Sequence, residues 1–148
     1  MIVKTKRFGD VEYDPKTAIV FPKGILGFPK EKRFVLLDPN KKSPLKWLQS
    51  LDRPDLAFVI TDPLIFKPEY EIKAFKSDLE ELEAEDFTHI TQFVIVTVPH
   101  DPSKMTANLK GPLLVNLENN LAKQLVLDDN SLSLKFRLIP EEKARIAG

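Results

Sequence analysis

Prolines divide most of this chain into short apolar runs. The sequence contains 12 prolines against only 5 glycines, and every proline except Pro140 falls within the first 112 positions. Because proline cannot donate a backbone hydrogen bond, it marks the ends of regular elements rather than their interiors. The runs between the prolines are rich in Val, Ile, Leu and Phe. Short runs of this kind, bounded by turn residues, are typical of a many-stranded antiparallel sandwich or barrel.

The apolar runs predict strands along most of the chain. We expect strands at residues 2–6, 11–13, 18–21, 34–37, 45–49, 57–61, 69–74, 91–98, 113–116, 123–127 and 132–138. Residues 93–98 and 125–127 are apolar at successive positions, so both faces of these strands are expected to be buried in the middle of the fold. The expected fold class is mainly β: a small antiparallel β-barrel-like single domain with one or two short helices.

One internal helix is predicted in the acidic stretch that follows residue 76. Ser77 and Glu80 have the spacing of a capping box, in which each side chain satisfies a backbone N–H at the start of a helix. Leu79 and Leu82 would then share one face of that helix. Residues 1–140 are expected to form the single domain. Residues 141–148 are expected to be a C-terminal tail, either a short helix or disordered.

Two apolar features are interpreted as parts of the core. The only tryptophan, Trp47, stands next to Leu48 in a predicted strand, and we expect it inside the barrel. The loop at residues 22–33 contains apolar side chains such as Ile25, and we expect it to cover one end of the barrel. A binding role for this loop is the alternative.

The residue types that most catalytic and metal sites need are scarce. The sequence has no cysteine, which excludes thiol catalysis, disulfides and the common cysteine zinc sites and fits a reducing cytoplasm. Of the two histidines, His100 stands beside Asp101 and Ser103, but a hydrolase triad needs side chains that converge from separate segments. We therefore expect a protein that is not an enzyme and has no cofactor and no metal. A hydrolase that uses His100 with a remote carboxylate is the remaining catalytic alternative.

The charges argue against polyanionic partners. Basic and acidic residues number 22 each, so the formal net charge is zero and the whole chain has no attraction for nucleic acid or an anionic membrane. The first third is cationic and contains Phe8 and Phe28, but core packing explains these rings better than an RNA-stacking platform. Residues 1–7 lack the apolar run of a signal peptide, and no run is long enough to span a membrane. We expect a cytoplasmic protein, monomeric when free, with no membrane or direct nucleic acid binding.

The segment after Pro63 is the first candidate for binding a protein partner. Two prolines, Pro63 and Pro68, cannot donate ladder hydrogen bonds, which favours a sheet edge or an irregular crossing. Exposed edge backbone of this kind suits an added peptide strand. Packing of the rings in the core is the alternative. The candidate residues are Leu64, Phe66, Glu69 and Tyr70.

The predicted helix supplies the second candidate. Glu80, Glu81 and Glu83 lie within a strongly acidic stretch and could form an electronegative patch that attracts a basic protein. An ordinary solvated helix face is the alternative interpretation.

Four segments, taken in order, resemble the FliW family of bacterial flagellar assembly factors. They are Phe21-Pro-Lys-Gly-Ile-Leu-Gly-Phe28, Arg33-Phe-Val-Leu-Leu-Asp38, residues 44–63, and residues 96–109 with their continuation into 112–116 and 124–128. None of them is a catalytic motif, and their specificity lies in their order across nearly the whole chain. Residues 131–137 depart from the family's pattern.

The resemblance implies a small β-barrel-like protein without enzymatic activity. Proteins of this family bind flagellin in the cytoplasm, and they also bind CsrA, an RNA-binding translational repressor, and relieve its block on flagellin mRNA. Accumulating flagellin occupies the FliW protein and frees CsrA to repress again, so the implied mechanism is partner exchange. The alternative is a small-molecule-binding β-barrel protein, which would need a dry cavity lined by residues such as Trp47 and Phe58.

Overall fold

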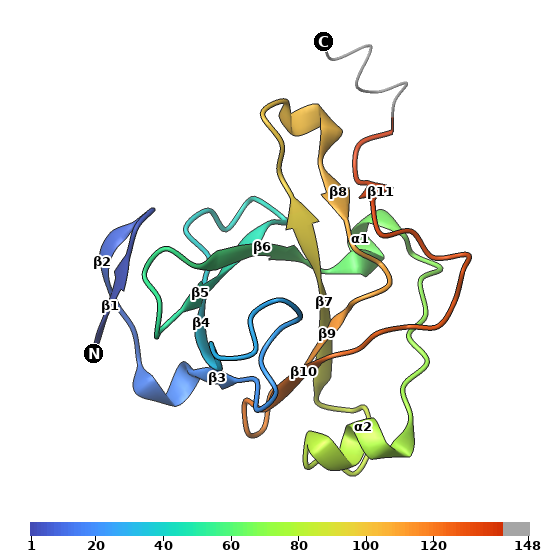
Figure 1. The fold of residues 1–148 in the computed structure, drawn as a ribbon, viewed down its shortest axis with the longest axis horizontal. Coiled ribbons are helices and arrows are strands. Elements are labelled where there is room, and N and C mark those ends of the chain that lie inside the picture. Colours follow the sequence, from blue (N-terminus) through green and yellow to red (C-terminus); the bar gives the residue numbers. More distant parts are fainter. Residues whose placement is uncertain (141–148) are drawn as a thin grey trace.

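A strongly curled antiparallel sheet forms the body of the structure, and a separate hairpin stands at its side (Figure 1). The computed structural model describes residues 1–140. Its strands are β1 (Ile2–Thr5), β2 (Gly9–Glu12), β3 (Ile19–Val20), β4 (Arg33–Leu37), β5 (Lys46–Ser50), β6 (Ala57–Thr61), β7 (Ile90–Thr97), β8 (Thr106–Ala107), β9 (Leu113–Asn116), β10 (Ala122–Gln124) and β11 (Phe136–Arg137). Its helices are α1 (Pro63–Phe66) and α2 (Lys76–Glu81), and its 3-10 turns are η1 (Pro15–Thr17) and η2 (Pro102–Lys104).

Strand β7 is the centre of the sheet. The nine-stranded sheet follows the order β10-β9-β7-β6-β5-β4-β3, and β8 joins β7 to β11 outside this path. The first half of β7 pairs with β9, and its second half pairs with β6 and β8. Val94 and Val96 are buried in an outer cluster, while Phe93 and Ile95 pack against the interior. The expected burial of both faces is therefore confirmed for residues 93–96, whereas Thr97 and Val98 are exposed. The same expectation is wrong for residues 125–127, where Leu125 is buried but Val126 faces solvent.

The two ends of this sheet come together without closing into a barrel. Val20 of β3 meets Leu121 in a single parallel bridge, and the Val20 N–H donates to the Asn120 carbonyl at 2.9 Å. One bridge is not a continuous ladder, so over residues 1–140 the sheet is curled rather than closed into a true barrel. In this form the predicted mainly β, barrel-like domain with two short helices is confirmed.

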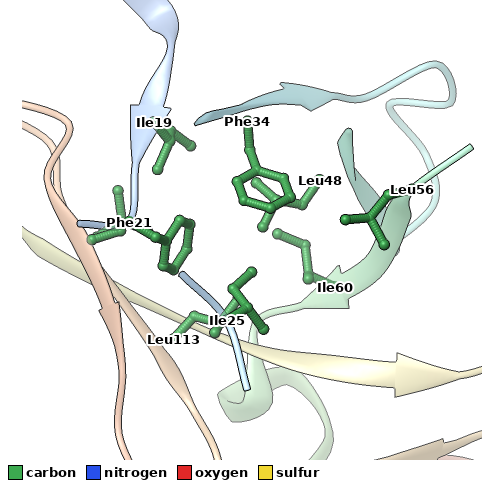
Figure 2. Close-up of a cluster of buried hydrophobic side chains, with 10 residues drawn as sticks. Ile19, Phe21, Ile25, Phe34, Leu48, Leu56, Ile60 and Leu113 are labelled. Carbon is green, nitrogen blue, oxygen red and sulfur yellow. The ribbon is translucent and has the colours of Figure 1, made fainter. Parts of the chain in front are cut away.

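Apolar side chains fill the inside of the curl (Figure 2). Phe21, Phe34, Leu48, Ile60 and Leu113 point toward one another and are almost completely buried. The rings of Phe21 and Phe34 meet edge to face, with their centroids 5.5 Å apart. Burial of each such side chain stabilises the fold by about 1.5–3 kcal/mol. The space that a ligand-binding barrel would leave open is occupied here by packed core.

The loop between β3 and β4 covers one end of this core. Ile25 and Phe28 form a tight turn: the Phe28 N–H donates to the Ile25 carbonyl at 2.6 Å, and the Ile25 N–H donates back at 3.3 Å. Ile25 is buried in the interior cluster and Phe28 packs against it. These contacts confirm the covering role predicted for residues 22–33, although Leu26 at the tip is exposed.

Two further clusters attach the second half of the chain to the outside of the sheet. One joins Val94 and Val96 of β7 to Tyr70, Leu109 and Leu138. The other lies beneath α2, where Leu82 meets Leu114 and Leu125. Helix α1, the extended segment after it and the chain beyond β10 are thereby held against one side of the sheet (Figure 1).

The predicted internal helix is present, but its cap is not the predicted one. Helix α2 begins at Lys76, with Phe75 in the N-cap position. Asp78 Oδ2 accepts a hydrogen bond from the Phe75 N–H at 2.7 Å, and so performs the role expected of Ser77 and Glu80. Asp78 is buried, and its other carboxylate oxygen accepts from Lys123 Nζ at 2.6 Å. The helix therefore starts two residues earlier than the Ser77 spacing predicts, and its cap pairs with Lys123, far along the sequence.

Several predicted strands are shortened or absent. Residues 69–74 belong to no strand, with Glu69 in a turn, and residues 132–138 contribute only the short β11. Strand β10 ends at Gln124, before the predicted end at residue 127. The tail predicted at residues 141–148 lies outside the described residues. Among residues 1–140, no helix has the length and apolar character of a membrane-spanning segment.

Candidate functional site

The residues considered for hydrolysis form a local turn. Asp101 Oδ1 accepts hydrogen bonds from the N–H and the hydroxyl of Ser103, at 3.0 and 2.7 Å, and caps η2. These bonds hold the pKa of Asp101 below its usual range, chiefly through the Ser103 side chain. The Ser103 hydroxyl is thus turned toward Asp101 rather than toward His100. Among residues 1–140, no group of three or more His, Asp or Glu side chains is arranged to hold a metal ion.

The prediction that Trp47 lies in the core is wrong. Successive residues of a strand point to opposite faces, and the inner position is taken by Leu48, whose register partner is Phe58. Trp47 and its partner Val59 therefore face the outside of the sheet, where Trp47 is half-buried. Phe58 instead packs inward, edge to face with Phe28. Trp47 and Phe58 both line a groove that is open at the surface, and this differs from the enclosed dry cavity that the small-molecule alternative requires.

The segment after Pro63 divides into exposed and buried residues. Asp62 caps α1 by accepting from the Leu64 N–H at 2.9 Å, and Leu64 is 41% exposed. Phe66 is half-buried against the outer cluster, and Glu69 is exposed beside Lys67 at 3.1 Å. A hydrogen bond from its own backbone and one from Lys67 lower the pKa of Glu69.

Tyr70 belongs to the core, as the alternative interpretation of its ring proposed. It is only 4% exposed, and its hydroxyl donates to the Leu109 carbonyl at 2.6 Å. Burial raises the pKa of Tyr70 to about 12. Of the four candidate residues, Leu64 and Glu69 are therefore open to a partner, Phe66 is partly open, and Tyr70 supports the fold beneath them.

A segment of unpaired backbone lies just beyond Tyr70. Within residues 1–140, the backbone N–H and C=O groups of residues 71–74 make no hydrogen bond. Ile72 and Ala74 turn inward, whereas Glu71 and Lys73 turn outward, as in a strand without a neighbour. Phe75 ends this segment and is 75% exposed. Residues 71–74 belong to no sheet, so of the two predicted arrangements, a sheet edge or an irregular crossing, the structure has the irregular crossing, with its unpaired backbone a few residues beyond Pro68.

A groove runs beside this segment. It has a volume of about 380 Å³ and lies between residues 67–75 and residues 126–132; we call it the edge groove. Val126, on the far wall, is 73% exposed like Phe75 on the near wall. Four carboxylates and two amines line it, namely Glu69, Glu71, Asp128, Asp129, Lys67 and Lys73. The edge groove thus combines free backbone, two exposed apolar side chains and an excess of negative charge.

The predicted acidic residues of α2 differ in availability. Glu80 and Glu83 are exposed, but Glu81 forms ion pairs with Lys23 and Lys123. Hydrogen bonds from Lys123 and then Lys23 lower the pKa of Glu81. Glu81 is therefore partly neutralised and ties α2 to the sheet.

A wider acidic surface begins where α2 ends. Glu83 adopts a left-handed backbone conformation with φ 52, which turns the chain out of the helix. A depression of about 460 Å³ follows, and we call it the acidic depression. Its acidic lining residues are Glu83, Glu85, Asp86 and Glu118. Glu118 comes from the turn between β9 and β10, where it pairs with His89 at 3.0 Å, and no local sequence signal placed it here.

Comparison with known proteins adds a family to this geometry. The FliW protein family matches residues 2–138 of the chain. The chain is 40% identical over 144 residues to the flagellar assembly factor FliW of Thermoanaerobacter pseudethanolicus, covering 97% of this chain and 96% of that protein. It is 37% identical over 145 residues to the FliW of Leptospira interrogans serovar Lai, covering 97% of each chain.

The fold is also that of a solved structure. A crystal structure of the flagellar assembly factor FliW superposes with a TM-score of 0.88 at 37% sequence identity. The match covers 96% of this chain and 99% of that one. The similarity therefore extends over both the curled sheet and the segments attached to its outside.

Proposed function

The chain belongs to the FliW family of flagellar assembly factors, and from this premise we propose that it binds flagellin and the translational repressor CsrA in turn. In this proposal it relieves repression of flagellin mRNA while it holds CsrA, and flagellin displaces CsrA when flagellin accumulates. The observation that carries the proposal is the family match over residues 2–138, together with a full-length structural match. The protein acts by binding, with no catalytic step.

The acidic depression is the proposed contact for CsrA. A protein that binds RNA presents basic side chains to phosphates, and the same side chains are attracted by a carboxylate cluster. Glu80 and Glu83 stand exposed at the end of α2, and the acidic depression continues from Glu83. Attraction between such surfaces mainly accelerates association and weakens as salt rises.

The edge groove is the proposed contact for flagellin. A polypeptide segment that lies along residues 71–74 would pair with backbone groups that have no partner within residues 1–140. Main-chain pairing supplies affinity in this mode, and pockets for alternate side chains supply selectivity. Phe75 and Val126 offer apolar contacts on the two walls, and Leu64 and Glu69 extend the surface toward α1.

The position of the two surfaces supports exchange. Residues 71–74 lead directly into Phe75, which is the N-cap of α2. A strand bound along the edge groove would therefore extend to the first turn of α2. The acidic depression begins at the other end of α2. Two partners of ordinary size would crowd each other there, because a standard interface covers about 800 Å² on each partner.

Competition calorimetry with purified cognate flagellin and CsrA tests the proposal. We expect each protein to bind alone, and flagellin to reduce or abolish the heat of CsrA binding. The double variant Glu80→Lys, Glu83→Lys should slow CsrA association and flatten its salt dependence. The matched control is Asp10→Lys, Glu12→Lys in β2, which makes the same charge change at exposed residues of the side hairpin. Absence of binding to both proteins would overturn the proposal.

A further inference from the structure

A third surface lies on the outer face of the sheet, around Trp47. The groove there has a volume of about 830 Å³, larger than the edge groove or the acidic depression. It runs between the turn of the β1–β2 hairpin, the loop that includes Pro39, and residues 95–100 after the centre of β7; we call it the tryptophan groove. None of the residues of the proposed flagellin and CsrA contacts lines it.

Apolar side chains form most of this groove. Trp47 and Val59 provide part of the floor, and Pro39 and Pro99 lie along its sides. Val98 is 46% exposed there, although it is a large apolar residue. A concave surface with exposed apolar side chains can bind the apolar side chains of another molecule.

One cation is held over the tryptophan. The guanidinium carbon of Arg7 lies 4.4 Å from the centroid of the Trp47 ring, and Phe8 meets the ring edge-on with centroids 5.4 Å apart. Arg7 forms no ion pair with any residue of the described chain, 1–140. A stacked guanidinium keeps its N–H groups free at the rim, where they can donate in pairs to a carboxylate.

The turn that carries Arg7 is fixed in place. The Thr5 hydroxyl donates to the Gly9 carbonyl at 2.8 Å and accepts from the Phe8 N–H at 2.7 Å. The Lys6 N–H donates to the Pro54 carbonyl at 2.9 Å and so ties the turn to the loop between β5 and β6. Arg7 is therefore presented from a preorganised turn, which reduces the entropy lost when a ligand binds.

The charges around the groove are of one sign. Among residues 1–140, Arg7 is the only Lys, Arg, Asp or Glu residue that lines it. Three carboxylates lie within two residues of a lining residue, and each has a partner: Asp38 pairs with Lys46 at 2.8 Å, Asp55 pairs with Arg53 at 3.0 Å, and Asp101 accepts from the N–H and the hydroxyl of Ser103. The groove thus complements a ligand that is mainly apolar and carries a carboxylate.

From these observations we propose that the tryptophan groove docks a segment of a partner protein in which an Asp or Glu carboxylate is flanked by apolar side chains. The carboxylate binds Arg7, and the apolar side chains cover Trp47, Val59 and Val98. This surface is separate from the proposed flagellin and CsrA contacts and does not depend on them.

A single-stranded RNA is the less suitable occupant. RNA grooves follow the phosphates with several Lys or Arg side chains and stack bases on open aromatic faces. Here Arg7 already covers one face of Trp47, and Phe8 meets its edge. The remaining lining is aliphatic or proline along most of its length.

Selection of peptides from a random phage-displayed library on the purified protein tests the proposal. We expect the selected peptides to share an acidic residue next to apolar ones. Trp47 is the only tryptophan, so its fluorescence reports binding of each synthetic peptide directly at the groove. Replacing the acidic residue of a selected peptide by its amide should weaken binding roughly tenfold, the loss of one charge-assisted contact.

Three variants decide the outcome. Arg7→Glu should abolish selection of acidic peptides. Val98→Asp should also abolish it, although Arg7 is unchanged in this variant. Both residues are exposed, so both variants should fold. Lys16→Glu, an equal charge reversal at exposed η1, should leave selection unchanged. The proposal is overturned if no peptides are enriched, if the same peptides are selected on Arg7→Glu, or if polyuridine RNA rather than peptide changes the Trp47 emission in an Arg7-dependent way.

Discussion

Single residues control how the loop over the core closes. Gly24 has φ +71, and a Cβ at this position would lie 2.5 Å from the Phe28 carbonyl oxygen and 2.7 Å from Pro29 Cα. Both neighbours are backbone atoms, so neither can move aside without opening the turn that buries Ile25. We predict that Gly24→Ala lowers the unfolding free energy by about 2–4 kcal/mol, from conformational strain together with the clash. Urea denaturation measures this loss.

Gly27 supplies a matched control for Gly24. Its φ is +88, but within the described structure a Cβ there would have no heavy atom within 4 Å beyond its own chain neighbours. Gly27→Ala should therefore show only the strain of the left-handed backbone, about 1 kcal/mol. Equal losses in the two variants would contradict the role assigned to close packing at Gly24.

Tyr70 should give the unfolding free energy a distinctive pH dependence. Burial raises its pKa to about 12, from an ordinary value of about 10. The folded state therefore holds the phenol proton more tightly than the unfolded state. The resulting stabilisation is complete below about pH 10 and is lost as the pH rises toward about 12, because unfolded chains ionise first.

The variant Tyr70→Phe isolates this effect. Below about pH 10 it should be less stable by about 1–2 kcal/mol, because the buried Leu109 carbonyl loses its hydrogen-bond donor. Between about pH 10 and pH 12 the difference from the unmodified protein should shrink, since only the latter loses the contribution of Tyr70. Urea unfolding at a series of pH values checks both statements. A difference that stays constant over this range would contradict them.

Among the elements, α2 depends on the carboxylate of Asp78 for its N-terminal cap and for its attachment to the sheet. Asp78 accepts from the Phe75 N–H and from Lys123 Nζ, so it caps the helix and fastens it to β10 at the same time. We predict that Asp78→Ala lowers the unfolding free energy by about 2–4 kcal/mol, as it removes a cap and leaves Lys123 with one acidic partner fewer. Hydrogen exchange should show α2 opening before the sheet.

Ser77→Ala is the control for this prediction. The capping-box spacing assigns the N-cap to Ser77, but within residues 1–140 its exposed side chain forms no hydrogen bond. The substitution should therefore change stability by no more than about 0.5 kcal/mol. A loss as large as that of Asp78→Ala would restore Ser77 as the cap.

The strands show what local pattern predicts and what it cannot. β4, β5, β6 and β9 lie within about one residue of their predicted positions, because each is an apolar run between turn residues. Residues 69–74 show the inward alternation of a strand at Tyr70, Ile72 and Ala74, yet they have no neighbour to pair with. Alternation fixes which side chains turn inward, whereas pairing depends on where distant chain segments pass.

The same distinction explains the candidate surfaces. The prediction that Trp47 lies inside rests on its place between Leu45 and Leu48, although period-two alternation requires Trp47 and Leu48 to face opposite ways. Glu83, Glu85 and Asp86 could be predicted as an acidic surface from their own stretch. Glu118 could not, because the turn between β9 and β10 brings it there only in the folded sheet. Contacts between segments that are distant in the sequence, such as those across the sheet, cannot be predicted from local sequence pattern.

At the scale of the whole molecule, the formal net charge is zero, but individual surfaces carry charges of opposite sign. Within the described residues, the tryptophan groove presents Arg7 and is lined by no acidic residue. The acidic depression presents four carboxylates and one histidine. The protein can therefore attract basic and acidic partners at different surfaces, although its overall charge attracts neither.

All these surfaces depend on the contact between the two ends of the curled sheet. We call this contact, between Val20 of β3 and residues 120–121, the seam. Asn120 lies in the turn between β9 and β10 with φ 60, a conformation that asparagine tolerates better than most residues. Its carbonyl accepts from the Val20 N–H at 2.9 Å, and its side-chain amide donates to the Lys16 carbonyl at 2.8 Å. Asn120 thus links the turn before β10 to β3 by a backbone hydrogen bond and to η1 by a side-chain hydrogen bond.

We predict that Asn120→Ala loosens the seam before it unfolds the sheet. The variant loses the bond to Lys16 and strains the left-handed turn, which together should lower the unfolding free energy by about 1–3 kcal/mol. Asn120→Gly keeps the turn relaxed and loses only the side-chain bond, so its loss should be the smaller of the two. Hydrogen exchange by NMR should show the Val20 amide losing protection while the amides shared by β6 and β7 keep theirs. Equal loss at both places would mean that the seam and the centre of the sheet open together, as in a barrel closed by a continuous ladder.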